Sequence, residues 1–161
     1  LTQCAASTVL DVIRQAGTKT AAGFQGSYFY EPFAKDPSIP DSEGMKLARR
    51  LWKENHPNEV PRDMYTNGLL SGMIIVKSIQ LSLEKVSPKD LDGEALKKYG
   101  LDRIRDFNAM GLTKPISYVR GDLDTHIGQR QVRYWKAKKD GNLFPVSEWM
   151  PTTTYRIPMN R

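Results

Sequence analysis

A hairpin signature lies near the carboxyl end of the 161-residue chain, within FNAMGLTKPISYVRGDLDTHIGQRQVRYWKAKKDGNLFPVSEW (Phe107–Trp149). Residues 131–138 show the period-two alternation expected of a half-buried strand. Asp140-Gly141 then favours a tight turn, and 143–146 supplies a returning strand. Before the polar loop, 116–119 predicts one more short strand. This stretch therefore predicts a strand, a loop and a β-hairpin.

The residues before this stretch are dominated by helical patterns. Apolar residues recur every three to four positions, with charged residues on the opposite faces. The expected elements are a helix over 8–16, a strand over 21–30, and helices over 42–55, 64–85 and 93–105. Three successive helices need a sheet to cover, and the chain supplies few strands. The sequence therefore predicts an α/β fold with incomplete sheets.

The longest of these helices carries two further expectations. Asp63 is the expected N-cap, because a short carboxylate accepts hydrogen bonds from the free amides of a first turn. Gly68 and Gly72 lie one turn apart, which predicts close packing of the helix against a neighbour. The stretch 64–86 is apolar but interrupted by polar and charged residues, so it does not predict a membrane span.

Composition limits the classes of function. The chain has 39% hydrophobic and 26% charged residues, as a globular domain does. Its net charge of +6 permits contact with nucleic acid, but its Lys and Arg are scattered, with the densest runs over 46–53 and 130–139. A basic nucleic-acid-binding domain therefore stays as an alternative. The single cysteine, Cys4, excludes an internal disulfide and a cysteine-based zinc site.

No motif for catalysis stands out. The sequence has no Gly-x-Ser-x-Gly nucleophile elbow, and Gly23–Gly26 lacks the third glycine and the lysine of a phosphate-binding loop. Asp122, Asp124 and His126 form the best candidate cluster for a metal, but carboxylates on alternate loop residues more often form turns. The sequence therefore predicts a protein that is not an enzyme, with no metal site and no cofactor.

Aromatic residues supply the candidate contacts for a ligand. Tyr28 and Tyr30 lie at the end of a predicted strand, and Met64 and Tyr65 lie at the start of the longest helix. Strand ends and helix starts are where α/β proteins place ligands. A tyrosine offers an apolar ring and a hydroxyl, which suits a small organic solute. The alternative is that these residues pack in the core or at a hinge.

The order and spacing of several segments resemble the branched-chain amino-acid-binding proteins, which are substrate-binding subunits of ABC importers. The segment 107–118 resembles a late stretch of that family, and Tyr65–Gly72 resembles one of its helix starts. The other similar segments are Tyr30–Phe33 with Asp36-Pro37, the loop residues Asp124, His126 and Gly128, Val132–Trp135, Asp140-Gly141 and Pro145–Trp149. The resemblance covers residues 8–150.

The resemblance implies part of a two-lobed, type I periplasmic-binding fold in which the chain crosses between lobes three times. Residues 1–31 would end lobe 2, and 32–122 would return through lobe 1. Residues 123–161 would make the final crossing and the closing hairpin of lobe 2. The chain would thus be the carboxy-terminal segment of both lobes, and the first half of the fold would lie upstream.

The resemblance also implies a function, namely capture of a small amino acid, amide, or aromatic or other organic acid in the cleft between the lobes. Tyr28, Tyr30, Met64 and Tyr65 would be cleft-wall residues, and Pro32, Asp124 and His126 would lie at the hinge. The partners would be the membrane permease subunits of an importer. The location would be the periplasm or a lipid anchor at the cell surface, with the export signal upstream. A cytosolic ligand-sensing regulator on the same fold is the alternative.

Overall fold

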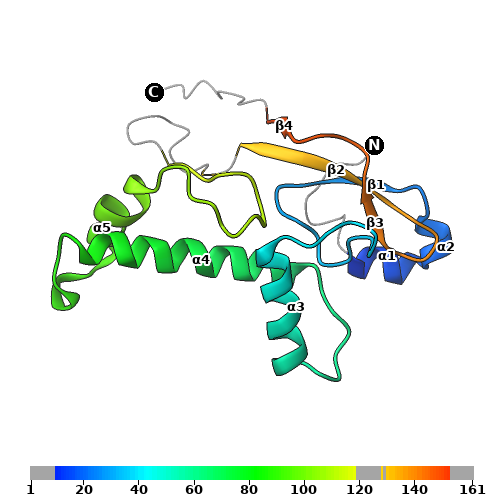
Figure 1. The fold of residues 1–161 in the computed structure, drawn as a ribbon, viewed down its shortest axis with the longest axis horizontal. Helices are drawn as coiled ribbons and strands as arrows, with labels where there is room; N and C mark the ends of the chain where they lie inside the picture. Colours follow the sequence, from blue (N-terminus) through cyan, green and yellow to red (C-terminus); the bar gives the residue numbers. More distant parts are fainter. Residues whose placement is uncertain (1–9, 119–127, 129, 153–161) are drawn as a thin grey trace, which may run out of the picture.

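The computed structural model describes residues 10–118, 128 and 130–152. The chain folds as a four-stranded antiparallel sheet with helices packed against it (Figure 1). The α-helices are α1 (Leu10–Ala16), α2 (Thr18–Ala21), α3 (Glu43–Asn55), α4 (Met64–Leu83) and α5 (Gly93–Ala95). Short 3₁₀ turns lie at Pro88–Asp90 and Leu101–Arg103, and a π-helical turn lies at Leu96–Gly100. The strands are β1 (Gln25–Tyr28), β2 (Gln131–Ala137), β3 (Leu143–Pro145) and β4 (Met150–Pro151).

The sheet confirms the predicted hairpin. β2 and β3 pair antiparallel with Lys136 opposite Phe144, and the turn between them places Gly141 at a φ of 86°. That left-handed conformation is the one that glycine adopts without steric cost. β1 pairs with the other edge of β2, and β4 pairs with the start of β2. β2 is therefore the central strand, and it buries Trp135 and Ala137.

α3 forms as its sequence predicts. The Ser42 hydroxyl accepts a hydrogen bond from the Met45 amide at 3.1 Å, which caps the helix. Met45, Ala48 and Trp52 lie on one face and are buried in a core cluster with Phe33 and Leu112. On the opposite face, the charged side chains of Glu43, Lys46, Arg50, Lys53 and Glu54 are exposed, as the charged stripe of the sequence requires.

α4 is the longest element, and Asp63 occupies its predicted N-cap position without making the expected side-chain capping bond. Asp63 already has helical backbone angles, with φ −60° and ψ −33°, and its side chain accepts no capping bond from the first turn. Its carboxylate instead accepts hydrogen bonds from residues far away in the sequence. The prediction of close packing at Gly68 and Gly72 is wrong for the described part of the chain, where a Cβ at either position would meet nothing within 4 Å.

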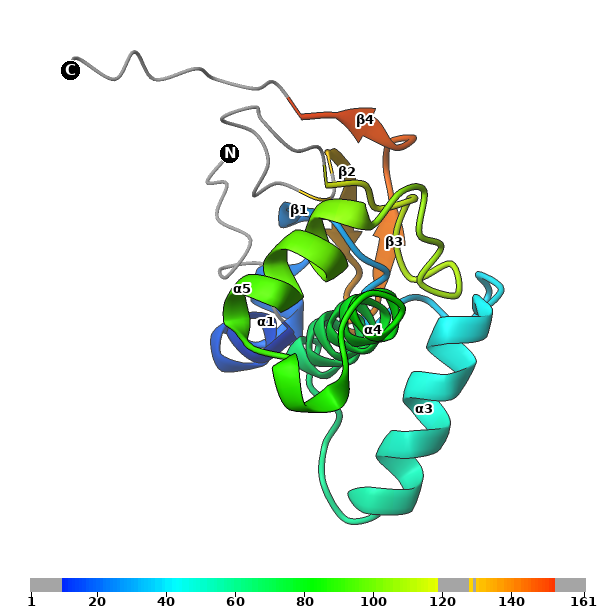
Figure 2. The same cartoon turned by 90° about the vertical axis from the view of Figure 1, so that its left-hand side faces the viewer.

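A larger core joins the sheet to α1 and α4. Its buried members come from every part of the described chain: Ile13, Tyr28, Tyr30, Leu70, Ile104, Ala109, Ile116, Trp135, Ala137 and Leu143. α4 runs lengthwise along the molecule, with the sheet at one end and α5 beside it at the other, while α3 projects to one side (Figures 1 and 2). Among the described residues, no helix is long and apolar enough to cross a membrane.

Two of the predicted strands differ clearly from the sequence prediction. β1 begins at Gln25, because Thr18–Ala21 forms the short helix α2. Within the described residues of 116–119, pairing amounts to one isolated bridge between Phe107 and Ile116, so the predicted strand does not form there. The mixed helix-and-sheet class, with an open and incomplete sheet, is confirmed.

Candidate functional site

A buried carboxylate lies where three segments meet. They are β1, the connection that leads from it to α3 (residues 31–42), and the start of α4. Asp63 is only 1% exposed. The Tyr28 hydroxyl donates to its Oδ2 at 3.3 Å, and the Ala34 amide donates to its Oδ1 at 3.0 Å. Tyr28 ends β1, Ala34 lies in the connection, and Asp63 immediately precedes α4. One side chain therefore joins the start of α4 to the end of β1 and to the connection, which lie 35 and 29 positions earlier in the chain.

Three of the four predicted ligand residues gather around this carboxylate. The rings of Tyr28 and Tyr30 meet edge to face with centroids 5.5 Å apart. The Tyr30 hydroxyl donates toward Met64 Sδ at 3.9 Å. Burial, and then the negative charge of Asp63, raises the pKa of Tyr30 well above its usual value, so this hydroxyl stays protonated. Both tyrosines are buried, whereas the Met64 side chain is half exposed.

The fourth predicted residue, Tyr65, lies in a separate aromatic cluster. Its ring meets Trp52 at a right angle with centroids 4.9 Å apart, and it also approaches Phe33 and His56. Tyr65 is partly exposed, so it offers ring surface beside the neighbouring Met64. α4 begins at Met64, so its first two residues present side chains to two different clusters.

The predicted hinge residues divide between described and undescribed parts of the chain. Pro32 is fully buried, at the start of the connection between β1 and α3. Asp124 and His126 lie outside the described residues.

The sequence did not single out an ion-pair network that fixes this connection. The Lys35 side chain is fully buried, and its ammonium group contacts the Glu31 carboxylate, Asp41 Oδ1 at 3.0 Å and the Pro40 carbonyl oxygen at 2.7 Å. Arg49 Nε donates to Asp41 Oδ2 at 2.8 Å, which ties α3 to the same network. No local pattern reveals Lys35, because its partners converge only after the proline-rich loop has folded.

The electrostatics of the network favour its charged form. Burial works to raise the pKa of Asp41, but hydrogen bonds from Arg49 and Lys35 outweigh it and hold that pKa below the usual range. A second pair joins the connection to the hairpin, since Lys138 donates to Asp36. That bond, followed by those from Ser38, lowers the pKa of Asp36 well below its usual value.

A cavity of about 500 Å³ lies beside the network, a size that suits a small molecule. Its walls come from the ends of α1 and α2, the connection, α3 and the hairpin turn. The lining residues are Arg14, Thr18, Phe33, Ala34, Lys35, Pro37, Ile39, Pro40, Asp41, Arg49, Pro61, Asp140, Gly141 and Asn142. The four predicted ligand residues lie near this cavity in the chain but do not line it.

The region offers groups for non-covalent contacts with a solute. Its charged groups form pairs with one another, and the described residues contain no group of three or more His, Cys, Asp or Glu that could hold a metal ion. Tyrosine rings, a methionine side chain and buried ion pairs can shape a pocket and orient a polar solute.

The comparison with solved structures places the fold. The chain matches a branched-chain amino-acid ABC transporter protein from Thermus thermophilus, solved with bound valine, with a TM-score of 0.67 and 20% identity over 89% of this chain and 37% of that one. It matches a fatty acid ABC transporter substrate-binding protein from Thermomonospora curvata with a TM-score of 0.61 and 17% identity, over 82% of this chain and 31% of that one.

A third match is an ABC transporter substrate-binding protein from Aeropyrum pernix, with a TM-score of 0.58 and 22% identity over 80% of this chain and 32% of that one. The chain thus spans about a third of the length of the structures that it matches. No family model matches the sequence, and no curated protein matches it significantly. At these identities the likeness shows the fold: the chain has part of the type I periplasmic-binding fold of ABC transporter substrate-binding proteins.

Proposed function

We propose that this chain is the carboxy-terminal part of an extracytoplasmic protein that captures a small solute for an ABC importer. The observation that carries the proposal is the fold, which three ABC transporter proteins share over 80% or more of the chain. The proposed solute is an amino acid or a related organic acid or amide. The bound valine of the Thermus thermophilus protein supports this class.

The proposed mechanism is capture by closure of two lobes. Residues 1–31 and 123–161 would belong to one lobe and 32–122 to the other, with Pro32, Asp124 and His126 at the crossings. A solute that binds the closed state more tightly than the open state shifts the population toward closure. The closed protein would then present its surface to the membrane permease subunits, outside the cytoplasm, either free in the periplasm or lipid-anchored.

Within this mechanism, Met64 and Tyr65 are the proposed contact residues at the start of α4. Met64 is half exposed and Tyr65 partly exposed, so both are accessible to a solute. Tyr28 and Tyr30 are buried, and the protonated Tyr30 hydroxyl is directed at Met64 Sδ, so both tyrosines would support Met64. An adaptable thioether beside a tyrosine ring suits the apolar part of a small solute.

A thermal-shift screen of the full-length protein that contains this chain tests the proposal. The panel holds amino acids, amides, and aromatic and fatty acids, because the matched proteins differ in the ligand that they name. A ligand at one hundred times its dissociation constant adds about 2.7 kcal/mol of stability, which raises the melting temperature by several degrees. Calorimetry then measures the affinity.

The proposal fails if no member of the panel stabilises the protein. A salt-dependent gel shift with generic DNA in the same preparation would instead favour the basic nucleic-acid-binding alternative.

A further inference from the structure

Asp63 combines two properties that a helix-start residue rarely has together. Its backbone begins α4 in the ordinary way, since its carbonyl oxygen accepts the Thr66 amide at 3.1 Å. Its side chain, however, turns away from the helix and accepts hydrogen bonds from Tyr28 and Ala34. A carboxylate that is 1% exposed is retained only with hydrogen-bond partners, because burying an unpaired charge is very costly.

The contact with Ala34 extends beyond the connection. The Ala34 amide donates to Asp63, while the Ala34 carbonyl oxygen accepts the Leu143 amide at 2.9 Å. The Asp36 amide also donates to the Leu143 carbonyl oxygen at 2.7 Å. The connection is thus held on one side by the start of α4 and on the other side by β3. Displacement of either neighbour would disturb the other through Ala34.

We propose that Asp63 is a positioning residue for solute binding, which couples the first turn of α4 to β1 and to the connection. The inference rests on the proposed function. Asp63 precedes Met64 directly, and Met64 in turn contacts the Tyr30 hydroxyl. Without the carboxylate, the Tyr28 hydroxyl and the Ala34 amide lose their acceptor, and unsatisfied buried groups drive local rearrangement. Met64 and Tyr65 would then leave the positions that the solute requires.

The test is a double-mutant cycle on solute affinity in the full-length protein, with Asp63→Asn and Met64→Ala. Asp63→Asn keeps the shape of the side chain, but it removes the charge and replaces one of the two acceptor oxygens with an NH₂ group, so one of the two donors loses its acceptor. We expect it to weaken binding about tenfold, equal to about 1.4 kcal/mol. We expect Met64→Ala to have a smaller effect in the Asp63→Asn background than in the wild type, because Met64 is no longer held in place. Residues that act together show such non-additivity.

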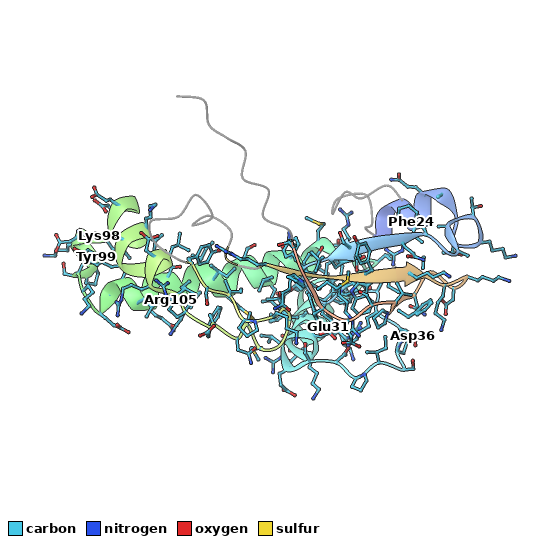
Figure 3. All side chains as sticks on the ribbon, turned by 90° about the horizontal axis from the view of Figure 1, so that it is seen from above. Phe24, Glu31, Asp36, Lys98, Tyr99 and Arg105 are labelled. Atoms are coloured by element: carbon cyan, nitrogen blue, oxygen red, sulfur yellow. The ribbon has the colours of Figure 1, made fainter. Side chains whose placement is uncertain are left out.

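Gly100→Ala is the matched control for stability. A Cβ on Gly100 would lie 2.5 Å from the Ser78 carbonyl oxygen, so this variant also destabilises the protein. Ser78 lies roughly 20 Å along α4 from Asp63 by the helix rise. Figure 3 shows the neighbouring Lys98 and Tyr99 at one end of the molecule, far from Asp36 toward the other end. We expect Gly100→Ala to lose stability and to keep its affinity within twofold of the wild type.

The outcomes separate the inference from the proposed function. If the wild type binds no solute, the proposed function fails and the inference fails with it. If the wild type binds and Asp63→Asn binds equally well, or if the two effects multiply independently, only the inference is overturned. If Asp63→Asn does not fold, Tyr28→Phe removes a single donor to the carboxylate. Tyr28→Phe should weaken binding about two- to threefold, and its effect should not be additive with that of Met64→Ala. Wild-type affinity in Tyr28→Phe would overturn the inference.

Discussion

Figure 1 shows the sheet at one end of α4 and a helical arm at the other. The two ends differ in how their side chains are buried and paired. The sheet end comprises α1, β1–β3, the connection 31–42 and the first turns of α3 and α4. It buries Tyr28 and Trp135 and pairs the fully buried Lys35 with carboxylates. The helical arm comprises α4 from Gly72 onward, α5 and the turns over 96–103. It exposes about half of the Ile75 and Val76 side chains.

Small residues on α4 allow the turns over 96–103 to approach it closely. Ser78 and Ser82 are fully buried where Gly100 approaches α4. Gly68 and Gly72 border an apolar groove of about 490 Å³ that also contains Met73, Val76 and Phe107. The sheet end thus pairs its buried Lys35 with carboxylates and leaves Met64 half exposed, whereas the arm exposes Ile75 and Val76 on α4. Residues that position a solute are expected at the former end.

The largest expected contrast between the ends concerns two lysines. Lys35→Ala leaves Glu31 and Asp41 without their buried cation, which should cost about 3–5 kcal/mol of unfolding free energy. Lys97→Ala on the arm removes an exposed pair with Asp102 and should cost about 0–1 kcal/mol. Urea denaturation followed by tryptophan fluorescence measures both. Equal losses would mean that the burial of Lys35 has no energetic consequence.

Two isoleucines give the next contrast. Ile13 on α1 is 1% exposed in the main core, so Ile13→Ala should cost about 2–5 kcal/mol through lost contacts and a cavity. Ile75 is 53% exposed, so Ile75→Ala should change stability by less than about 0.5 kcal/mol. The same denaturation series compares them. A comparable loss at Ile75 would show that another part of the protein covers α4.

Replacement of two helical glycines by alanine should change stability in opposite directions. A Cβ on Gly44 would lie 2.4 Å from Leu112 Cγ, so Gly44→Ala should cost about 1–3 kcal/mol by overpacking. A Cβ on Gly72 meets nothing within 4 Å, so Gly72→Ala should stabilise α4 by about 0.5–1 kcal/mol. Thermal melts of the two variants and the wild type measure both changes in stability. Destabilisation by Gly72→Ala would restore the sequence-based prediction of close packing there.

The smallest expected effect is an acid dependence at the sheet end. The Lys138 bond, with those from Ser38, lowers the pKa of Asp36 in the folded state. The unfolded chain therefore binds more protons at low pH, so this contribution to stability is complete above about pH 4 and is lost below it. Lys138→Met should show a weaker loss between pH 5 and 2 than the wild type. Lys138→Arg should retain the wild-type profile, and identical profiles for all three would contradict the assignment.

Features fixed by local pattern could be predicted from the sequence. The Ser42 cap and the buried face of α3 follow from residues within one helix. The β2–β3 hairpin follows from a turn that needs a left-handed residue, and Gly141 supplies it. The grouping of Tyr28 and Tyr30 with Met64 also agrees with their places at a strand end and a helix start.

Features that depend on distant partners could not be predicted in this way. Asp63 carries the residue type of an N-cap, yet its carboxylate binds groups 29 and 35 positions earlier in the chain. Lys35 lies in a polar loop and would be expected on the surface, but the carboxylates that bury it converge only in the folded protein. Long-range hydrogen bonds outweighed local preference at both positions.

Calorimetric titration of Tyr65→Ala in the full-length protein, with the solute identified by the screen, tests whether the start of α4 binds the solute. Tyr99→Ala on the helical arm is the matched control, because Tyr99 lies at one end of the molecule, beyond the far end of α4 from Tyr65 (Figure 3). We expect Tyr65→Ala to weaken binding tenfold or more, about 1.4 kcal/mol, and Tyr99→Ala to leave the affinity unchanged. Unchanged affinity in Tyr65→Ala would contradict a solute-binding surface at the start of α4.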